Sequence, residues 1–387
     1  MTHADPYAFS VEALRSRRTT KWHKFDPDVL PAWVADMDFG VAPPVLEALQ
    51  KLIDAEEFGY SDRGGALEAA FVRRMLRRFG WETHAADVHP IGDLVQASFA
   101  AVTAFSEPGD GVVLQLPSYP PFQDAITGTG RRIVANPMRR DGKGWRLDLG
   151  AFDANPDPKA KVLIFCHPQN PTGRAFTEAE LAEVAAFAVR HDLVVVSDEI
   201  HADILYDGRR HRPLASMGPE IAARTLTITS ATKGYNIPAL RTAAIHFGSP
   251  ALRQRFFARL PAKLLGFPSV MGIDATVAAW DAGDPWFAET LARLEANRDY
   301  LARAIPEALP GAVFLPPEAT YLAWIDCAAL DLGMPAQQFF LERARVGLNA
   351  GETFGSGYDA CVRLNFATTP AILQEIVGRM ADAVRQR

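Results

Sequence analysis

The segments KVLIFCHPQNPTG at 161–173 and LVVVSDEIH at 193–201 decide the fold of this chain. Each opens with an apolar run rich in β-branched residues, which is typical of a strand buried on both faces of a sheet. Between them, Thr177 and Glu180 have the spacing of a capping box, and apolar residues recur at helical spacing from 181 to 188. The stretch therefore predicts a strand, a helix and a parallel strand that form one βαβ unit.

The same alternation continues on both sides of this unit. Further strand candidates occur at 111–116, 131–136, 225–229 and 242–247. With the first two they predict a mostly parallel sheet covered by helices on both faces, which indicates the α/β class. The C-terminal third differs, with amphipathic helix patterns near 287–304, 336–345 and 370–384 around short strand candidates at 321–326 and 361–366.

We therefore expect two domains and a preceding segment, since 387 residues are more than one small core requires. The large domain spans 46–283, and a smaller α+β domain spans 284–387. Residues 1–45 are irregular and are expected to pack on the smaller domain or on a partner chain.

Composition argues against several kinds of partner. A formal net charge of -6 at pH 7 gives no reason to expect nucleic acid, because its binders usually carry a basic surplus. Cys166, Cys327 and Cys361 are far apart, so neither a disulfide framework nor a metal site is expected. The sequence has no signal-peptide pattern and no apolar run near the roughly 18 residues of a membrane span. We expect a cytoplasmic protein with no membrane partner.

Asn170, Asp198 and Lys233 each follow a predicted strand of the large sheet. Open α/β sheets bind ligands at the carboxyl ends of their strands. Taken singly, Lys233 is explained as a solvated side chain, Asp198 as a helix cap and Asn170 as part of a turn. Together they match the needs of pyridoxal 5'-phosphate (PLP), which takes a lysine at its aldehyde, an acid at its pyridine nitrogen and a donor near its 3' oxygen.

The motifs NPTG at 170–173, SDEIH at 197–201 and SATK at 230–233, followed by Arg241, are jointly specific. With them the chain resembles the fold-type I PLP-dependent enzymes over essentially its whole length, and within that group the MalY/PatB-like cystathionine β-lyases. The segments that carry this closer resemblance are KWHKF (21–25), WVADMDF (33–39), FGYSD (58–62), LPSYPPF (116–122), SDEIHADI (197–204), YNIPAL (235–240), TYLAWIDC (320–327) and VRLNFA (362–367). The resemblance implies the PLP-dependent transferase fold, PLP as cofactor, an amino-acid substrate and a homodimer with shared active sites.

The resemblance also implies roles for individual residues. Lys233 holds PLP as a Schiff base and, once released, removes the α-proton, while Asp198 keeps the pyridine nitrogen protonated. Tyr119 stacks on the ring and is counted with these two as catalytic, and Arg363 binds the substrate α-carboxylate. The further cofactor contacts implied are those of Asn170, His201, Ser230 and Arg241, of Leu94 and Val95 at a helix N-terminus, and of the partner subunit's Tyr60.

Two positions depart from the lyase pattern. IGDLVQA at 91–97 carries Gly92 and Asp93 where these relatives tend to have a TxG-type turn, and a carboxylate facing a phosphate would repel it. We expect Asp93 to cap the helix with its side chain turned away. Arg241 stands where many aminotransferases have a phosphate-binding arginine and where the lyase subgroup often has a small residue.

The activity that the resemblance implies is β-elimination at a carbon–sulfur bond of a cysteine S-conjugate, giving pyruvate, ammonia and a thiol. The main alternative is an aminotransferase, because the same residue types serve both reactions. Another is an enzyme of S-cysteinyl conjugates with a decarboxylative or oxidative outcome. A purely regulatory protein would be expected to have a damaged cofactor site, whereas Lys233, Asp198, Asn170 and Arg363 are all present. The sequence does not specify the group on sulfur.

Overall fold

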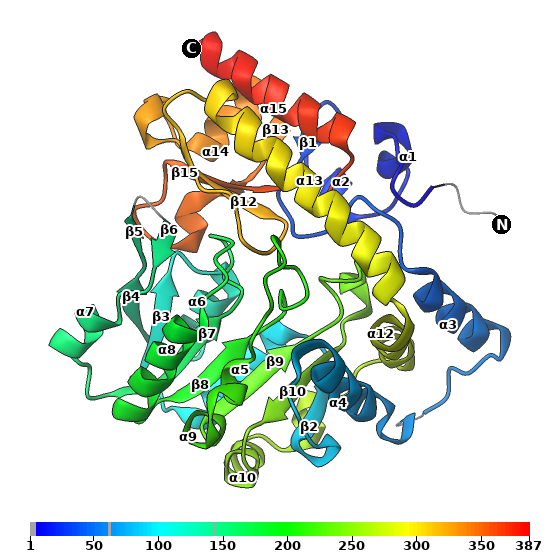
Figure 1. Ribbon diagram of the computed structural model, residues 1–387, viewed down its shortest axis with the longest axis vertical. Coiled ribbons are helices and arrows are strands. Elements are labelled where there is room, and N and C mark those ends of the chain that lie inside the picture. Colours follow the sequence, from blue (N-terminus) through cyan, green and yellow to red (C-terminus); the bar gives the residue numbers. More distant parts are fainter. Residues whose placement is uncertain (1–4, 61–62, 142–143) are drawn as a thin grey trace.

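The computed structural model describes residues 5–60, 63–141 and 144–387. A seven-stranded sheet forms its centre, in the order β2-β10-β9-β8-β7-β3-β4 (Figure 1). β10 is antiparallel to both neighbours, and the other neighbouring strands are parallel. The strands are β2 (Val88–Ile91), β3 (Gly111–Leu116), β4 (Arg132–Pro137), β7 (Ala160–Cys166), β8 (Val194–Asp198), β9 (Thr225–Thr229) and β10 (Ala243–Phe247). The predicted α/β class with a mostly parallel sheet is confirmed.

The six strands expected from the sequence of the large sheet are present, each displaced by at most one residue at either end. The seventh strand, β2, was not predicted. Its sequence VHPI is short and contains Pro90, which cannot donate a backbone hydrogen bond. β2 lies at the edge of the sheet, where proline is tolerated.

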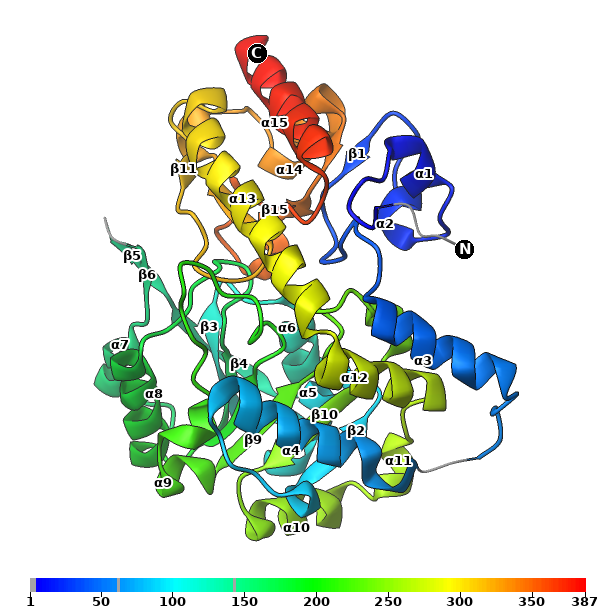
Figure 2. The ribbon, with the colours of Figure 1, turned by 45° about the vertical axis from the view of Figure 1, so that its right-hand side comes forward.

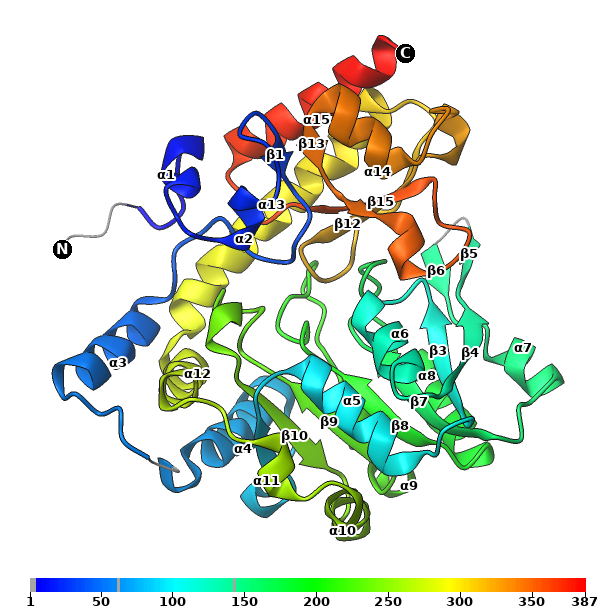
Figure 3. The same cartoon turned by 180° about the vertical axis from the view of Figure 1, so that it is seen from behind.

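Helices cover both faces of the large sheet because successive strand residues point to opposite sides. In β7, Val162 and Ile164 belong to the core that includes α5 and α10, whereas Leu163 and Phe165 belong to the core that includes α8. Figure 3 shows α5 lying across the sheet on the side opposite α8. The helices of this part are α3 (Pro43–Asp54), α4 (Ala66–Phe79), α5 (Leu94–Phe105), α6 (Pro120–Thr127), α7 (Leu149–Ala154), α8 (Glu178–Arg190), α9 (Pro219–Ala222), α10 (Pro250–Arg259), α11 (Ala262–Leu265) and α12 (Val270–Ala282).

The predicted capping box of α8 is confirmed. Thr177 accepts from the backbone N–H of Glu180, and the Glu180 side chain accepts from the backbone N–H of Thr177. Arg174 binds the same Glu180 carboxylate through Nη2 at 2.7 Å, which ties the start of α8 to the turn after β7.

The C-terminal part contains a second, four-stranded antiparallel sheet in the order β11-β12-β15-β14. The long helix α13 (Asp284–Ala308) runs from the helices of the large sheet toward it (Figure 2). The other elements are β11 (Val313–Phe314), β12 (Leu322–Asp326), α14 (Ala336–Phe339), β13 (Val346–Gly347), β14 (Asn349–Ala350), β15 (Cys361–Asn365) and α15 (Pro370–Arg385). The single helix predicted at 336–345 is wrong in detail: α14 passes into a π-helical turn at Phe340–Ala344, which ends at Arg345 in the left-handed conformation.

The N-terminal segment contains α1 (Val11–Arg15), α2 (Thr20–His23) and β1 (Leu30–Pro31). Elsewhere, β5 (Arg139–Asp141) and β6 (Gly144–Arg146) form a small antiparallel pair. β1 pairs in parallel with β13, which places this segment beside the C-terminal part (Figure 1). Lys21 and Asp38 form a buried ion pair at 2.8 Å, with both side chains 2% exposed. Trp22 donates to the other oxygen of the same carboxylate.

Within the described residues, no helix has both the length and the apolar character needed to cross a membrane.

Candidate active site

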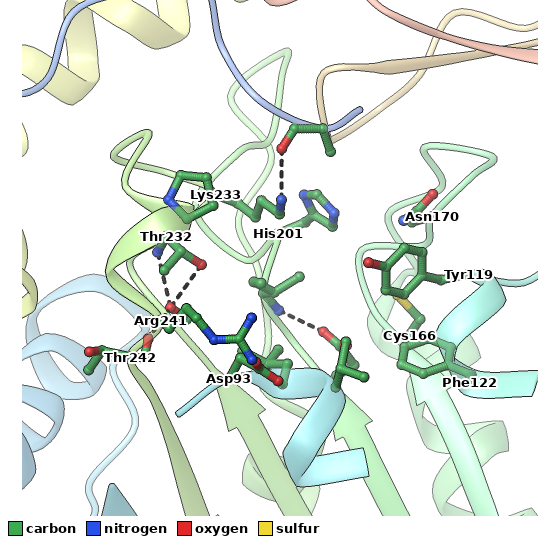
Figure 4. A pocket seen from close by; sticks show the side chains of 17 residues that line it. Asp93, Tyr119, Phe122, Cys166, Asn170, His201, Thr232, Lys233, Arg241 and Thr242 are labelled. Carbon is green, nitrogen blue, oxygen red and sulfur yellow. Dashed lines mark hydrogen bonds and ion pairs between the residues drawn. The ribbon is translucent and has the colours of Figure 1, made fainter. Parts of the chain in front are cut away.

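A cavity opens at the carboxyl ends of the large-sheet strands (Figure 4). It brings together side chains that are far apart in the sequence. The predicted site residues that line it are Leu94, Val95, Tyr119, Asn170, Asp198, His201, Ser230, Lys233 and Arg241. Arg363 and Tyr60 do not line it.

Lys233 lies just after β9 and points into this cavity (Figure 4). Its Nζ donates a 2.7 Å hydrogen bond to the carbonyl oxygen of Ala35. Desolvation lowers the pKa of Lys233 to about 8, opposed by the negative charge of Asp36. A substantial fraction of this amine is therefore neutral and nucleophilic near physiological pH.

Asp198 is the last residue of β8 and is buried in the cavity wall. One carboxylate oxygen accepts from the backbone N–H of Ile200 at 3.0 Å. Desolvation raises the pKa of Asp198 to about 7, and the neighbouring charge of Glu199 acts in the same direction. A cationic ring nitrogen placed against this carboxylate would favour its ionised form.

Arg363 projects from β15 of the second sheet, and burial lowers its pKa to about 10. It donates to Asn170 Oδ1 at 2.9 Å, to the Trp33 carbonyl at 3.0 Å and to Asn349. Its Nε is buried without a partner, and no carboxylate in the described part of the chain forms an ion pair with Arg363. A buried guanidinium in this condition is suited to an anionic ligand such as a carboxylate.

Tyr119 and Asn170 lie on the side of the cavity across from Lys233 (Figure 4). Tyr119 packs edge-on against Phe122 with ring centroids 5.6 Å apart, and burial raises the pKa of its hydroxyl. Because Asn170 Oδ1 accepts from Arg363, its amide nitrogen is left to donate to a ligand. His201 is 2% exposed, its Nδ1 has no partner, and desolvation lowers its pKa to about 3, which keeps the ring neutral.

The segment WVADMDF at 33–39 borders the cavity through Ala35. Its carbonyl oxygens are bonded by side chains from distant parts of the chain. Arg363 donates to the carbonyl of Trp33, and both Lys233 and Tyr321 donate to that of Ala35. Asn365 donates to the carbonyls of Val34 and Asp36, and Lys21 also donates to that of Asp36. Asn236 donates to the carbonyls of Met37 and Phe39. One irregular segment therefore positions both Lys233 and Arg363.

Asn236, Tyr321 and Asn365 were not predicted as site residues. All three lie within segments that carry the family resemblance, YNIPAL, TYLAWIDC and VRLNFA. Their position in these segments was the one sign in the sequence that they could belong to the site. The sequence pattern does not reveal which carbonyls they bind.

At the opposite end of the cavity, Asp93 caps α5, with Oδ1 accepting from the backbone N–H of Gln96 at 2.7 Å. The predicted cap is confirmed, but the side chain is not turned away. Asp93 lines the cavity and its Oδ2 pairs with Arg241 (Figure 4). Both features that depart from the lyase pattern therefore meet in one ion pair.

Tyr60 lies on the surface with a relative exposure of 112% and borders a separate groove with Phe58 and Phe267. The last two residues of its motif, Ser61 and Asp62, fall outside the described residues. Among the described residues of one chain, Tyr60 is not part of the lining of the cavity.

A fold of this kind, with a lysine, a carboxylate and an amide at successive strand ends, is that of the PLP-dependent transferases. The family of class I and II aminotransferases matches residues 34–380, and the chain belongs to it. Cystathionine β-lyase PatB of Bacillus subtilis is 32% identical, over 95% of this chain and 97% of the relative. The crystal structure of OvoB is similar to this chain, with 35% identity and a TM-score of 0.92 over 96% of this chain and 97% of the other. Cystalysin from Treponema denticola, whose structure contains PLP, is 27% identical with a TM-score of 0.92 over the whole of both chains.

The donors of the cavity fit PLP. Lys233 is a partly neutral amine for the aldehyde, and Asp198 is a buried acid that a pyridinium would ionise. His201 and Asn170 line the same cavity, and the Asn170 amide nitrogen remains available to a ligand.

We predict that Lys233 reacts with an aldehyde at a rate that rises with pH and levels off above about 8, because only the neutral amine attacks. Pyridoxal trapped on the protein with borohydride at a series of pH values, and located by peptide mass spectrometry, gives the titration midpoint. Asp36→Asn should lower this midpoint, because the Asp36 carboxylate raises the pKa of Lys233. A midpoint as high as that of a solvated lysine would contradict the prediction.

Proposed function

We propose that this protein is a PLP-dependent carbon–sulfur β-lyase that converts an L-cysteine S-conjugate of the cystathionine type to pyruvate, ammonia and a thiol. The observation that carries the proposal is one cavity lined by Lys233, Asp198 and Asn170, with the Asn170 side chain bound to the buried Arg363, which has no carboxylate partner among the described residues. The similarity to PatB, a relative named as a cystathionine β-lyase, supports the choice of reaction.

PLP supplies an electron sink for the carbanion that forms at the substrate α-carbon. Lys233 would hold its aldehyde carbon and Asp198 its pyridine nitrogen. Tyr119 would cover the ring, and the Asn170 amide would donate to the 3' oxygen. Ser230, Arg241 and the helix N-terminus at Leu94 and Val95 would meet the phosphate.

The substrate would be oriented by its α-carboxylate, which would bind at the buried Arg363 guanidinium. Arg363 is held in place by Asn170, Asn349 and the Trp33 carbonyl, so little reorganisation accompanies binding. Because Arg363 and Lys233 bind the carbonyls of Trp33 and Ala35, two residues apart, a carboxylate held by the guanidinium would direct the α-carbon toward the amine.

Lys233 moves the proton. The released Nζ, as the neutral amine, would take the α-proton, and the electron pair of that C–H bond would form a Cα–Cβ double bond while the β-sulfur leaves as a thiolate. The Ala35 carbonyl, which accepts from Nζ at 2.7 Å, orients the amine. A thiolate leaves readily near neutral pH, since thiols ionise with a pKa of about 8.5, so no separate acid is required. The remaining three-carbon unit hydrolyses to pyruvate and ammonia.

Purified protein incubated with L-cystathionine should release pyruvate, ammonia and homocysteine in equal amounts without any keto-acid acceptor. Lys233→Ala should abolish the release together with the visible absorption of bound PLP. Alanine, which has no β leaving group, should turn over poorly. Brisk transamination that depends on an added acceptor, with no pyruvate from cystathionine, would identify an aminotransferase instead.

Arg363→Lys should lower kcat/KM by roughly 2 to 4 kcal/mol, because lysine cannot reproduce the bidentate grip on a carboxylate. PLP binding, followed by absorbance, should survive. Arg385→Lys, on an exposed helix end, is the matched control and should leave both quantities unchanged. If the Arg363 variant loses PLP or fails to fold, the role of this arginine is structural.

We also propose a homodimer with shared sites. Tyr60 does not line its own cavity, and it lies with the exposed Phe58 and Phe267 along one groove. A second copy seated on this groove would cover these aromatic side chains and bring Tyr60 toward the phosphate end of the neighbouring cavity.

Subunit complementation tests this arrangement. Tyr60→Ala and Lys233→Ala subunits should each be inactive or nearly so as homodimers. After mixing and exchange, hybrid dimers should regain activity, because one of their two sites contains Lys233 from one chain and Tyr60 from the other. No recovery in verified hybrids, or full activity in a monomer, would contradict shared sites.

A further inference from the structure

The ion pair between Asp93 and Arg241 has no part in the reaction steps proposed above. Asp93 Oδ2 and Arg241 Nη2 meet at the edge of the cavity (Figure 4), where the Arg241 side chain is 72% exposed and that of Asp93 is 23% exposed. Asp93 is also fastened through Oδ1 to the backbone N–H of Gln96. The carboxylate is therefore the anchored member of the pair, and the guanidinium is the more exposed one.

This pair lies where an anion would bind. The first turn of α5 leaves the backbone N–H groups of Leu94 and Val95 without a partner, whereas that of Gly92 bonds to the Gln96 side chain. Ser230 and Thr232 bring hydroxyl groups to the same end of the cavity. Of the cavity-lining residues in the described chain, only Lys233 and Arg241 are cationic, and Lys233 is taken up with the aldehyde end of the cofactor.

We propose that Asp93 competes with the cofactor phosphate for Arg241, so that PLP is held more weakly and exchanges more readily than the cavity would otherwise allow. The inference rests on the assignment of this cavity to PLP. Arg241 turns from the carboxylate to the phosphate when PLP enters and returns when PLP leaves.

The change of partner by Arg241, from the Asp93 carboxylate to the phosphate and back, requires little free energy. An ion pair with a largely exposed arginine is weak, so little is lost when it opens. A phosphate carries nearly two negative charges and three acceptor oxygens, so it can accept charge-assisted hydrogen bonds from Arg241 in place of the carboxylate. Asp93, held by the Gln96 N–H, stays beside the site and remains available to recapture the guanidinium.

Asp93→Asn isolates the charge, because asparagine caps a helix about as well as aspartate and α5 should be preserved. Titration of the apoprotein with PLP, followed by visible absorbance, should show a Kd lowered roughly three- to fivefold, which is the size of effect that a weak, exposed ion pair can exert as a competitor. Pyridoxal, which lacks the phosphate, is the control ligand and should bind the wild type and Asp93→Asn equally. An unchanged or higher Kd for PLP, or an equal gain for pyridoxal, would overturn the proposal.

Arg241→Gln distinguishes competition from simple repulsion of the phosphate by Asp93. In this background the competition is already removed, so Asp93→Asn should change the Kd for PLP by less than about twofold. An equal gain in both backgrounds would mean that Asp93 acts directly on the phosphate and not through Arg241, which contradicts the proposal.

Inorganic phosphate separates this inference from the proposed function. Calorimetry on the apoprotein should show tighter phosphate binding in Asp93→Asn than in the wild type, and no such difference in the Arg241→Gln background. If the chain binds no PLP but shows this pattern, the proposed function fails and the competition stands. Equal phosphate binding by wild type and Asp93→Asn would refute the competition whatever the cofactor.

Discussion

The hydrogen bonds to the backbone carbonyls of residues 33–39 are the constraint on which the site depends. Buried backbone groups outside helices and sheets must find partners, and here side chains provide them. Lys233 follows β9 of the large sheet and Arg363 lies on β15 of the second sheet, yet both bind this one segment. The segment thereby sets the spacing between the amine and the guanidinium, and the buried pair of Lys21 and Asp38 fastens its far end.

Burial has opposite consequences for two arginines of this protein. Arg174 is buried but pairs with Glu180 and Glu318, so its charge is balanced and its role is structural. Arg363 is equally buried and has only neutral partners. A buried charge without a counter-charge destabilises the protein unless an anionic ligand neutralises it. The same desolvation leaves Lys233 partly neutral and Asp198 partly protonated. A substrate carboxylate would balance the charge of Arg363, and a cationic ring nitrogen would balance that of Asp198.

Much of the large domain was predictable because its signals are local. Apolar runs in β7, β8 and β9 predicted strands, and their ends predicted where Asn170, Asp198 and Lys233 would meet. β2 was not predicted because it is only four residues long and one of them is a proline. We did not predict the positioning roles of Asn236, Tyr321 and Asn365 for another reason. Each binds a carbonyl more than a hundred residues away along the chain.

The sequence by itself determined the fold class, the strand-end placement of the chemical groups and the cap of α5, because periodicity and capping act over a few residues. The tertiary structure alone decided that Arg363 would lack a carboxylate, that Ala35 would orient Lys233 and that Asp93 would pair with Arg241. Each of these contacts joins segments far apart in the chain. Their geometry follows from how the sheets and helices pack, and no local pattern encodes it.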